Sequence, residues 1–362
     1  MTARVWQLVP VLEEGDAIGD HARRMARILG DRHAGFIVER AAPALKRLTT
    51  HITNAEVEPG DILVYHVALA SQLGQWLRTV QARRVIDYHG ITPPVFLRAY
   101  DAGLSVALSR AKDELESLRD RVELALADSD YLRAELDQLG FGRTETLPIL
   151  LDFSRYDIAP NRELMDRLQA GKRGVGDILF VGRLAPNKRQ ENLVKAFAVY
   201  RRVYNPAARL FLVGRPDIRK YAAALDAFIE RLGIEEVHVV GRVSPADLAA
   251  YYRSSDVFLA MSEHEGFGIP WLEAMYLGLP VVTYAAAAVG ETVASGGLLL
   301  HDKGAEHVAA VLDLVLRDEG LRARLVEAGR RRVAQLLPER FEARLLRIIE
   351  DLEASMRPKP VG

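Results

Sequence analysis

Two acidic residues with seven residues between them, Glu265 and Glu273, stand in the stretch SEHEGFGIPWLEAMYLGLP. Gly266 and Gly268 lie between them and predict a turn, and the next proline suits the first turn of a helix. Both carboxylates can then face one pocket. Carboxylates accept paired hydrogen bonds from vicinal hydroxyls, such as those of a ribose or a hexose. The alternative is a pair of acids that only complements the helix dipole and binds no ligand.

Two further turns follow predicted strands in the second half of the chain. In FVGRLAPNK, Arg183 and Lys188 stand between a strand and a helix, where two cations beside helix amides suit a diphosphate. Two ordinary surface cations are the alternative. In VVGRVSP, Gly241 permits a tight turn and Val243 offers backbone groups to a flat ring. An ordinary strand-to-helix turn explains this motif equally well.

The first half carries weaker signals of the same kind. Gly15 and Gly19 stand at the start of a predicted helix in EEGDAIGDHARR and suit a phosphate-facing turn, although they do not form a GxGxxG fingerprint. His89 in RVIDYHGITPP ends a predicted strand, where an imidazole can serve as a proton or hydroxyl partner. A hydrogen-bonded structural histidine is the alternative.

The composition narrows the class of protein. The 362 residues are 49% hydrophobic and 27% charged, which is typical of a globular protein of two domains. The net charge of −1 gives no overall attraction to nucleic acid. The chain has no cysteine, which excludes disulfides and thiolate metal sites. The triplet Asp128-Ser129-Asp130 is a poor match to a metal-binding DxD motif.

No apolar run approaches 18 residues, and the N-terminus lacks the pattern of a signal peptide. We therefore expect no membrane span. The expected location is the cytoplasm, with the inner face of the cell membrane as a further possibility. The basic stretch from His21 to Arg24 could meet a lipid diphosphate or an anionic membrane, or it could be a solvated helix face.

Apolar runs alternate with helical patterns along the chain, and this predicts parallel sheets buried on both faces. In the second half we expect strands over 177–183, 208–214, 236–243, 256–262 and 280–284, and helices over 188–204, 221–233, 245–255 and 269–278. In the first half we expect strands over 5–12, 35–39, 61–68, 83–90 and 144–151, helices over 20–30 and 71–81, and a long charged helix over 105–126.

This pattern predicts an α/β fold of two Rossmann-like, doubly wound domains. The first domain is expected over residues 1–155 and the second over 156–338. The remaining residues, 339–362, form an amphipathic helix that can pack back on the first domain. The polar stretch over 152–176 separates the two strand-rich regions.

Four motifs, in order and spacing, resemble the donor-binding half of retaining glycosyltransferases of family four. They are FVGRLAPNK, LFLVG, VVGRVSP and SEHEGFGIPWLEAMYLGLPVV. In the first half, YHGITPP and LPILLDFSRYD are similar to corresponding stretches of these enzymes, and of a bacterial branch assigned to surface polysaccharide or lipopolysaccharide assembly. The resemblance implies the GT-B architecture, in which two Rossmann-like domains face a central cleft.

The resemblance also implies roles for the candidate residues. Glu273 would hold the ribose hydroxyls of a nucleotide sugar, and Glu265 the hydroxyls of the transferred sugar. Arg183 and Lys188 would hold the diphosphate, while His89 would approach the sugar from the first domain. The implied catalytic residues are His89, Arg183, Lys188 and Glu265. The implied donor-binding residues are Gly15, Gly19, Gly182, Arg183, Lys188, Gly241, Val243, Glu265, Gly266, Phe267, Gly268, Ile269 and Glu273.

The activity implied is that of a retaining hexosyltransferase with a nucleotide-sugar donor and a glycan or lipid-linked glycan acceptor. No metal and no cofactor are expected. GDP-mannose is slightly favoured, although Ser244 and Pro245 stand where some relatives carry an acidic residue for guanine. The alternatives are a UDP-hexose-dependent transferase acting on a small molecule, a sugar-nucleotide epimerase of the same fold, and a non-catalytic binding protein.

Overall fold

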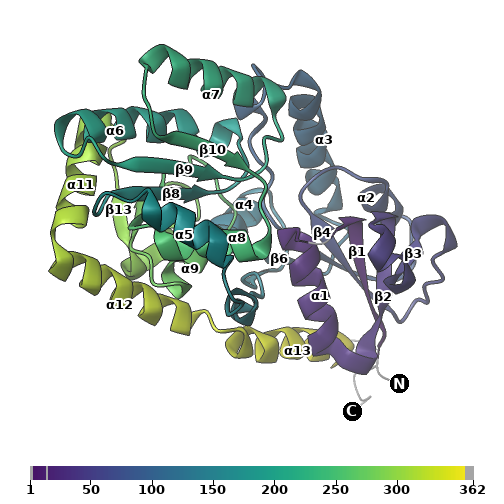
Figure 1. Cartoon of the computed structure of the whole chain (residues 1–362). Helices are drawn as coiled ribbons and strands as arrows, with labels where there is room; N and C mark the ends of the chain where they lie inside the picture. Colours follow the sequence, from purple (N-terminus) through teal and green to yellow (C-terminus); the bar gives the residue numbers. More distant parts are fainter. Residues whose placement is uncertain (1–2, 14, 355–362) are drawn as a thin grey trace. The chain divides into compact units, whose positions relative to one another are not determined.

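A computed structural model describes residues 3–13 and 15–354, which form two compact units (Figure 1). Unit 1 is built from the chain up to Ile91, from Val106 to Asp152 and from Leu337 onward. Unit 2 is built from Thr92–Ser105 and Phe153–Leu336.

The internal segment Thr92–Ser105, which lies within the predicted first domain of residues 1–155, packs with unit 2. Two ring contacts within unit 2 explain this. The ring of Tyr100 packs edge-on against Tyr221 at 5.2 Å, and the guanidinium of Arg189 lies 5.4 Å from the centre of the Phe96 ring.

Unit 1 contains a seven-stranded parallel sheet in the order β3-β2-β1-β4-β5-β6-β7. The order reverses at β1, where Val5 lies opposite His33 of β2 on one side and Ile62 of β4 on the other. Such a reversal opens a crevice at the carboxyl ends of the strands, where doubly wound sheets bind ligands. The strands are β1 Val5–Leu12, β2 His33–Ala41, β3 Thr49–His51, β4 Ile62–Val67, β5 Arg83–Tyr88, β6 Leu124–Ala127 and β7 Thr144–Thr146.

The helices of unit 1 come from both ends of the chain. They are α1 Ala17–Leu29, α2 Gln72–Leu77, most of α3 Ala102–Leu118, α4 Asp130–Gln138 and the C-terminal α13 Pro338–Ala354. Helix α13 inserts Leu345, Ile348, Ile349 and Leu352 into the core that also contains Val5. Burying a side chain of this size stabilises a fold by roughly 1.5–3 kcal/mol.

The long helix predicted over 105–126 is wrong in its second part. Helix α3 ends at Leu118, and Leu124–Ala127 forms the fully buried strand β6. A short apolar run has no periodicity that separates a buried strand from a helix, which is why the run was misassigned and α4 after it was missed. The strand predicted over 144–151 is also too long. Only Thr144–Thr146 pairs with β6, while Leu147 and Leu150 are buried in the core beyond it.

Unit 2 contains a six-stranded parallel sheet in the order β10-β9-β8-β11-β12-β13. Its strands are β8 Asp177–Val181, β9 Arg209–Val213, β10 Val237–Gly241, β11 Val257–Ala260, β12 Val281–Tyr284 and β13 Leu298–Leu300. The first five of these were predicted. The helices are α5 Arg162–Ala170, α6 Gln190–Val203, α7 Arg219–Leu232, α8 Pro245–Ser254, α9 Ile269–Tyr276, α10 Val289–Val293, α11 Ala305–Arg317 and α12 Glu319–Gln335.

Both sheets have the order of a doubly wound α/β domain, so the predicted fold class is confirmed. Among the described residues, no helix combines the length and the apolarity that crossing a membrane requires.

Candidate active site

Three neighbouring strands of unit 2 end in glycine. Gly182 follows β8, Gly214 follows β9, and Gly241 closes β10. The amide of Gly182 donates to the carbonyl of Val213, and the amide of Gly214 donates to the carbonyl of Gly241, both at 2.9 Å. A Cβ on Gly214 would lie 1.9 Å from the carbonyl oxygen of Gly182, so this approach excludes any side chain. The result is an edge of bare backbone that a ligand can approach closely.

Gly182 and Gly241 were predicted donor-binding residues, whereas Gly214 was missed. The repeat of FVG, LVG and VVG at three strand ends was the signal that could have identified it.

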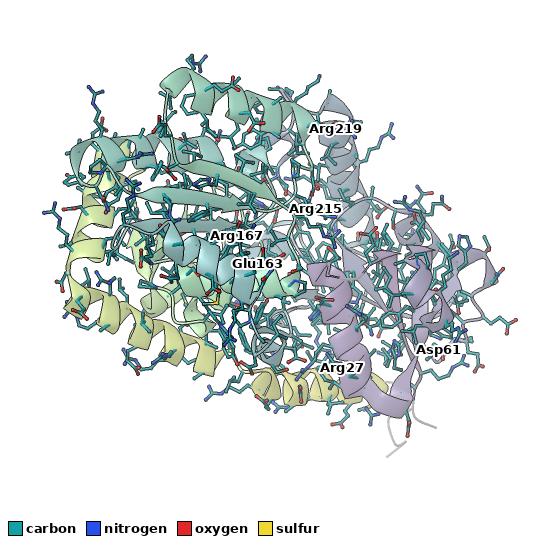
Figure 2. All side chains as sticks on the ribbon, in the orientation of Figure 1. Arg27, Asp61, Glu163, Arg167, Arg215 and Arg219 are labelled. Carbon is teal, nitrogen blue, oxygen red and sulfur yellow. The ribbon has the colours of Figure 1, made fainter. Side chains whose placement is uncertain are left out.

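Two arginines stand beside this glycine edge. Arg183 follows Gly182 directly. Arg215, which was not predicted, follows Gly214 and is labelled in Figure 2. The guanidinium of Arg183 is 3.9 Å from Asp217, and that of Arg215 is 3.5 Å from the same carboxylate. The backbone is fixed, because the carbonyl of Arg183 accepts from Gln190 and that of Arg215 accepts from the amide of Leu184. The Arg183 side chain is 59% exposed, so it can reach an anionic ligand from a fixed base.

Lys188 and Glu265 form an ion pair between two loops of unit 2. The Lys188 ammonium lies 2.5 Å from Glu265 Oε2, and the two side chains are only 15% and 9% exposed. The loops are joined by Asn187, whose amide donates to the carbonyl of His264 and whose carbonyl accepts from the amide of Glu263. The second oxygen, Glu265 Oε1, is buried and has no hydrogen-bond partner within the described part of the chain. A buried oxygen of this kind favours a ligand hydroxyl as its donor.

The turn after Glu265 is built for close packing. Gly268 has φ +100°, and a Cβ there would come 2.9 Å from the ring of Trp271. Thr292 donates its hydroxyl to the carbonyl of Phe267, and the Phe267 side chain is buried. Helix α9 then begins at Ile269, which is half-buried, as is Val243 after β10. The predicted turn from Gly266 to Gly268 and the helix after it are thus present.

Glu273 is buried in α9, and hydroxyl groups surround its carboxylate. Tyr252 of α8 donates to Glu273 Oε2 at 2.7 Å, and Tyr156 donates to Oε1. The two tyrosines were not predicted, because they lie far from Glu273 in the sequence and nothing near them marks a site.

Unit 1 holds the remaining candidates. Gly15 is exposed with φ +71°, and Asp16 caps α1 by accepting from the amide of Gly19 at 3.1 Å. A Cβ on Gly19 would lie 3.0 Å from the carbonyl oxygen of Glu13. The predicted turn at the start of a helix is therefore present, and the helix begins at Ala17 rather than at residue 20.

His89 follows β5 and its side chain is 3% exposed. Its Nδ1 lies 2.9 Å from both oxygens of Asp128, and its Nε2 lies 3.0 Å from Nδ1 of His66. Burial lowers the pKa of His89, but the carboxylates of Asp128 and Asp87 outweigh it and raise the pKa to about 9. Both ring nitrogens are thus engaged inside unit 1, as a structural histidine requires.

The DxD triplet is also used by the fold. Asp128 faces His89, Ser129 caps α4, and Asp130 accepts from the Thr146 hydroxyl at 2.5 Å.

The basic stretch from His21 to Arg24 is not an open cationic surface. His21 is fully buried, and its Nε2 lies 2.9 Å from Asp87. Arg24 pairs with Asp152 at 3.2 Å and with Glu342 of α13 at 2.6 Å, and Arg23 pairs with Asp20. Acidic side chains of the same unit thus pair with both arginines of this stretch, and its contact with a lipid diphosphate or a membrane stays a prediction.

Comparison with known proteins adds independent findings. Residues 167–332 match the family model described as glycosyl transferases group 1. An uncharacterised glycosyltransferase of Methanocaldococcus jannaschii is 34% identical over 159 residues, which cover 43% of this chain and 40% of that protein. The GDP-mannose-dependent alpha-(1-6)-phosphatidylinositol monomannoside mannosyltransferase of Mycolicibacterium smegmatis is 28% identical over 302 residues, 75% of this chain and 74% of that protein.

Among solved structures, sucrose-phosphate synthase from Thermosynechococcus elongatus superimposes with a TM-score of 0.75 at 19% identity. The match covers 98% of this chain and all of that one. This likeness agrees with the predicted fold class.

Proposed function

From the match of residues 167–332 to the group 1 glycosyl transferases, we propose that this chain moves a hexose from a nucleoside diphosphate sugar to a glycan or lipid-linked glycan. The proposal includes retention of anomeric configuration and independence of metal. Mannose is the favoured sugar.

The observation that carries the proposal is the Lys188–Glu265 pair. It lies at the strand ends where doubly wound domains bind ligands, and it offers a cation and a buried carboxylate oxygen, Glu265 Oε1, to one ligand. A sugar diphosphate needs both features, because its phosphates are anionic and its sugar presents hydroxyl groups. Arg183 and Arg215 beside the glycine edge add two cations for the phosphates.

In the proposed reaction, the bond between the anomeric carbon and the diphosphate oxygen breaks, and a bond from that carbon to an acceptor oxygen forms. The proton of the acceptor hydroxyl passes to the departing diphosphate. Lys188 stabilises the charge that develops on the diphosphate, and a pre-positioned cation of this kind is usually the largest single contribution to catalysis. Glu265 orients the sugar by accepting from its hydroxyls, and Glu273 accepts from the ribose.

GDP-mannose is favoured as the donor, because a relative aligned over three quarters of this chain is named for it. That relative's name also includes phosphatidylinositol monomannoside, which supports a lipid-linked acceptor. A role in bacterial polysaccharide assembly is part of the proposal. Ser244 stands at the position where some relatives carry an acidic residue that recognises guanine. The Ser244 hydroxyl instead caps α8. Base recognition would therefore depend on other groups around Val243.

The proposal is tested by thermal unfolding of the purified protein with UDP, GDP, ADP, TDP and CDP, each alone and with its common sugars. A ligand that binds only the folded protein stabilises it by about 2.7 kcal/mol at about 100 times its Kd. We expect GDP and GDP-mannose to raise Tm most. A larger shift with UDP would reassign the donor, and no shift with any nucleotide would contradict the proposal. Incubating the best donor without acceptor then separates slow hydrolysis, expected of a transferase, from epimer formation or no reaction.

Metal independence gives a separate prediction. Lys188, Arg183 and Arg215 supply the positive charge that a divalent ion would otherwise bring to the diphosphate. Turnover in the presence of excess chelator is therefore expected to equal turnover without it. Complete loss of activity that a divalent ion restores would contradict this prediction.

A further inference from the structure

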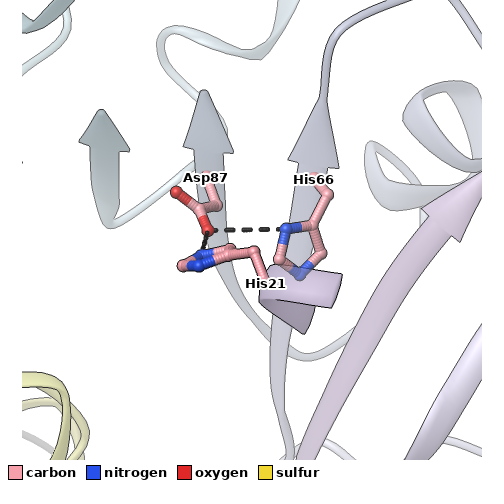
Figure 3. A group of neighbouring side chains, drawn as sticks. All are labelled: His21, His66 and Asp87. Carbon is pink, nitrogen blue, oxygen red and sulfur yellow. Dashed lines mark hydrogen bonds and ion pairs between the residues drawn. The ribbon is translucent and has the colours of Figure 1, made fainter. Parts of the chain in front are cut away.

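Five titratable side chains meet in the interior of unit 1, at the carboxyl ends of β4, β5 and β6. They are His21, His66, Asp87, His89 and Asp128, and each side chain is at most 3% exposed. Figure 3 shows the part formed by His21, His66 and Asp87. Because water does not reach these groups, each proton among them must be assigned to a hydrogen bond within the protein.

Gln7 determines the direction of the hydrogen bonds at one end of the cluster. Its Nε2 donates to the carbonyl of Ala22 at 2.9 Å, so its Oε1 is the atom 3.0 Å from His66 Nε2. An amide oxygen only accepts, and His66 Nε2 must therefore carry a proton. His66 Nδ1, on the other side of the ring, lies 3.0 Å from His89 Nε2.

Asp128 closes the other end. His89 Nδ1 lies 2.9 Å from both oxygens of this carboxylate, which calls for one proton between them. The contact between His66 and His89 joins two nitrogens and calls for another. Together with the proton on His66 Nε2, the hydrogen-bonded series Gln7–His66–His89–Asp128 therefore needs three protons on its ring nitrogens and carboxylate. Two neutral imidazoles and an ionised carboxylate supply only two, so this series carries one extra proton.

The extra proton lies on His89 rather than on Asp128. Burial raises the pKa of the Asp128 carboxyl group, but the facing His89 ring lowers it, and two carboxylates, not one, face that ring. The groups that face the His89 ring are the carboxylates of Asp128 and of Asp87, whose Oδ2 is 3.8 Å from His89 Nε2, the more distant Asp16, and the rings of His66 and His21. Burial lowers the pKa of His66, so that ring stays neutral. His89 then donates from both nitrogens, to Asp128 and to His66.

His21 has a different position in the cluster. Its Nδ1 accepts from the backbone amide of Leu150 at 2.9 Å, so the proton of the neutral ring is on Nε2, which donates to Asp87 at 2.9 Å. A metal-bound histidine normally donates from its second nitrogen to an acceptor, and His21 faces a donor there. The cluster of His21, His66 and Asp87 is thus arranged for protons rather than for a cation.

We propose that Gln7, His66 and Asp128 are positioning residues that hold His89 as a fixed imidazolium. If the proposed function holds, a protonated His89 cannot remove the acceptor's proton. In the proposed transfer that proton passes to the leaving diphosphate, and the role of His89 is that of a buried positive charge.

The test is an NMR titration of the histidine side chains in the full-length, ¹⁵N-labelled protein, which needs no substrate. We expect one ring to keep both nitrogens protonated at neutral pH and to titrate near pH 9, and its signals to be absent from His89→Gln. In Asp128→Asn the same ring is expected to lose its second proton at a distinctly lower pH. The NMR signals of the exposed His238 of unit 2 serve as the internal control and should be the same in every variant.

A neutral His89 at neutral pH in the unaltered protein would overturn the proposal, whether or not any variant folds. A second readout is the dependence of donor turnover on pH. A fixed imidazolium gives no rise through the neutral range in the unaltered protein, whereas Asp128→Asn should lose turnover as the pH rises through that range. If the NMR result holds and nucleotides do not bind, the proposed function has failed and the inference about His89 has not.

The same arrangement affects stability. The pKa of His89 in the folded protein, about 9, lies above the ordinary value of 6.5. The stability that this proton contributes is therefore complete below about pH 6.5 and is lost as the pH rises through 9.

Discussion

Lys188→Ala is expected to lower the turnover number of the proposed transfer by about 10²–10³-fold, which is the usual loss when one pre-positioned charge is removed from a developing anion. The ammonium is only 15% exposed and lies 2.5 Å from Glu265, so its position is set before a substrate arrives. The measurement is steady-state release of the nucleoside diphosphate with the donor identified by thermal unfolding.

The control for this variant is Lys172→Ala. Lys172 is also a lysine of unit 2 in a largely buried ion pair, 2.7 Å from Asp256, with side chains 18% and 15% exposed. The Lys172→Ala variant loses a similar ion pair away from the glycine edge. If the loss of any such pair lowered turnover by destabilising the fold, both variants would show the loss. Equal turnover in Lys188→Ala and the unaltered protein would contradict the assigned role. The double variant with Glu265→Gln removes the carboxylate that Lys188→Ala leaves unpaired, and should recover stability without recovering turnover.

Glu273→Gln is expected to weaken the binding of the free nucleoside diphosphate by about 10–100-fold, because hydrogen bonds to a charged group contribute about 1.5–3 kcal/mol. Glutamine preserves the size of the side chain and can still accept from one of the two tyrosines. Calorimetric titration with the preferred nucleoside diphosphate measures the effect directly.

Tyr252→Phe is the matched control, since it removes the 2.7 Å hydrogen bond to Glu273 and leaves the carboxylate in place. Weak binding in both variants would assign the loss to the packing of α8 against α9. Unchanged affinity in Glu273→Gln would show that this carboxylate does not contact the nucleotide.

The candidate residues of unit 2 could be predicted because their positions depend on local sequence. An apolar run followed by glycine predicts where a strand ends, as at Gly182 and Gly241, and Gly266 and Gly268 predict the turn before α9. These predictions need no knowledge of contacts between distant residues, only the assumption that each strand lies in a parallel sheet.

What could not be predicted depends on contacts between distant positions. The Tyr156 and Tyr252 hydroxyls meet Glu273 only after three separate segments fold together. The partners of His89 come from β4 and from the residue after β6, and β6 was not recognised at all. The sequence pattern of a histidine at a strand end is the same whether its ring nitrogens face a ligand or, as here, two buried side chains.

Helix α13 has a consequence for the order in which the protein is made. Its Leu345, Ile348, Ile349 and Leu352 complete the core around Val5 in β1, so one interior joins two segments that are synthesised far apart in time. During synthesis, part of the apolar face of the first sheet stays uncovered until α13 is made, and Phe153–Leu336 must be made before it. Exposed apolar surface of this kind favours aggregation and chaperone binding. All strands of the second sheet lie between Asp177 and Leu300, so this sheet can form before α13 has been made.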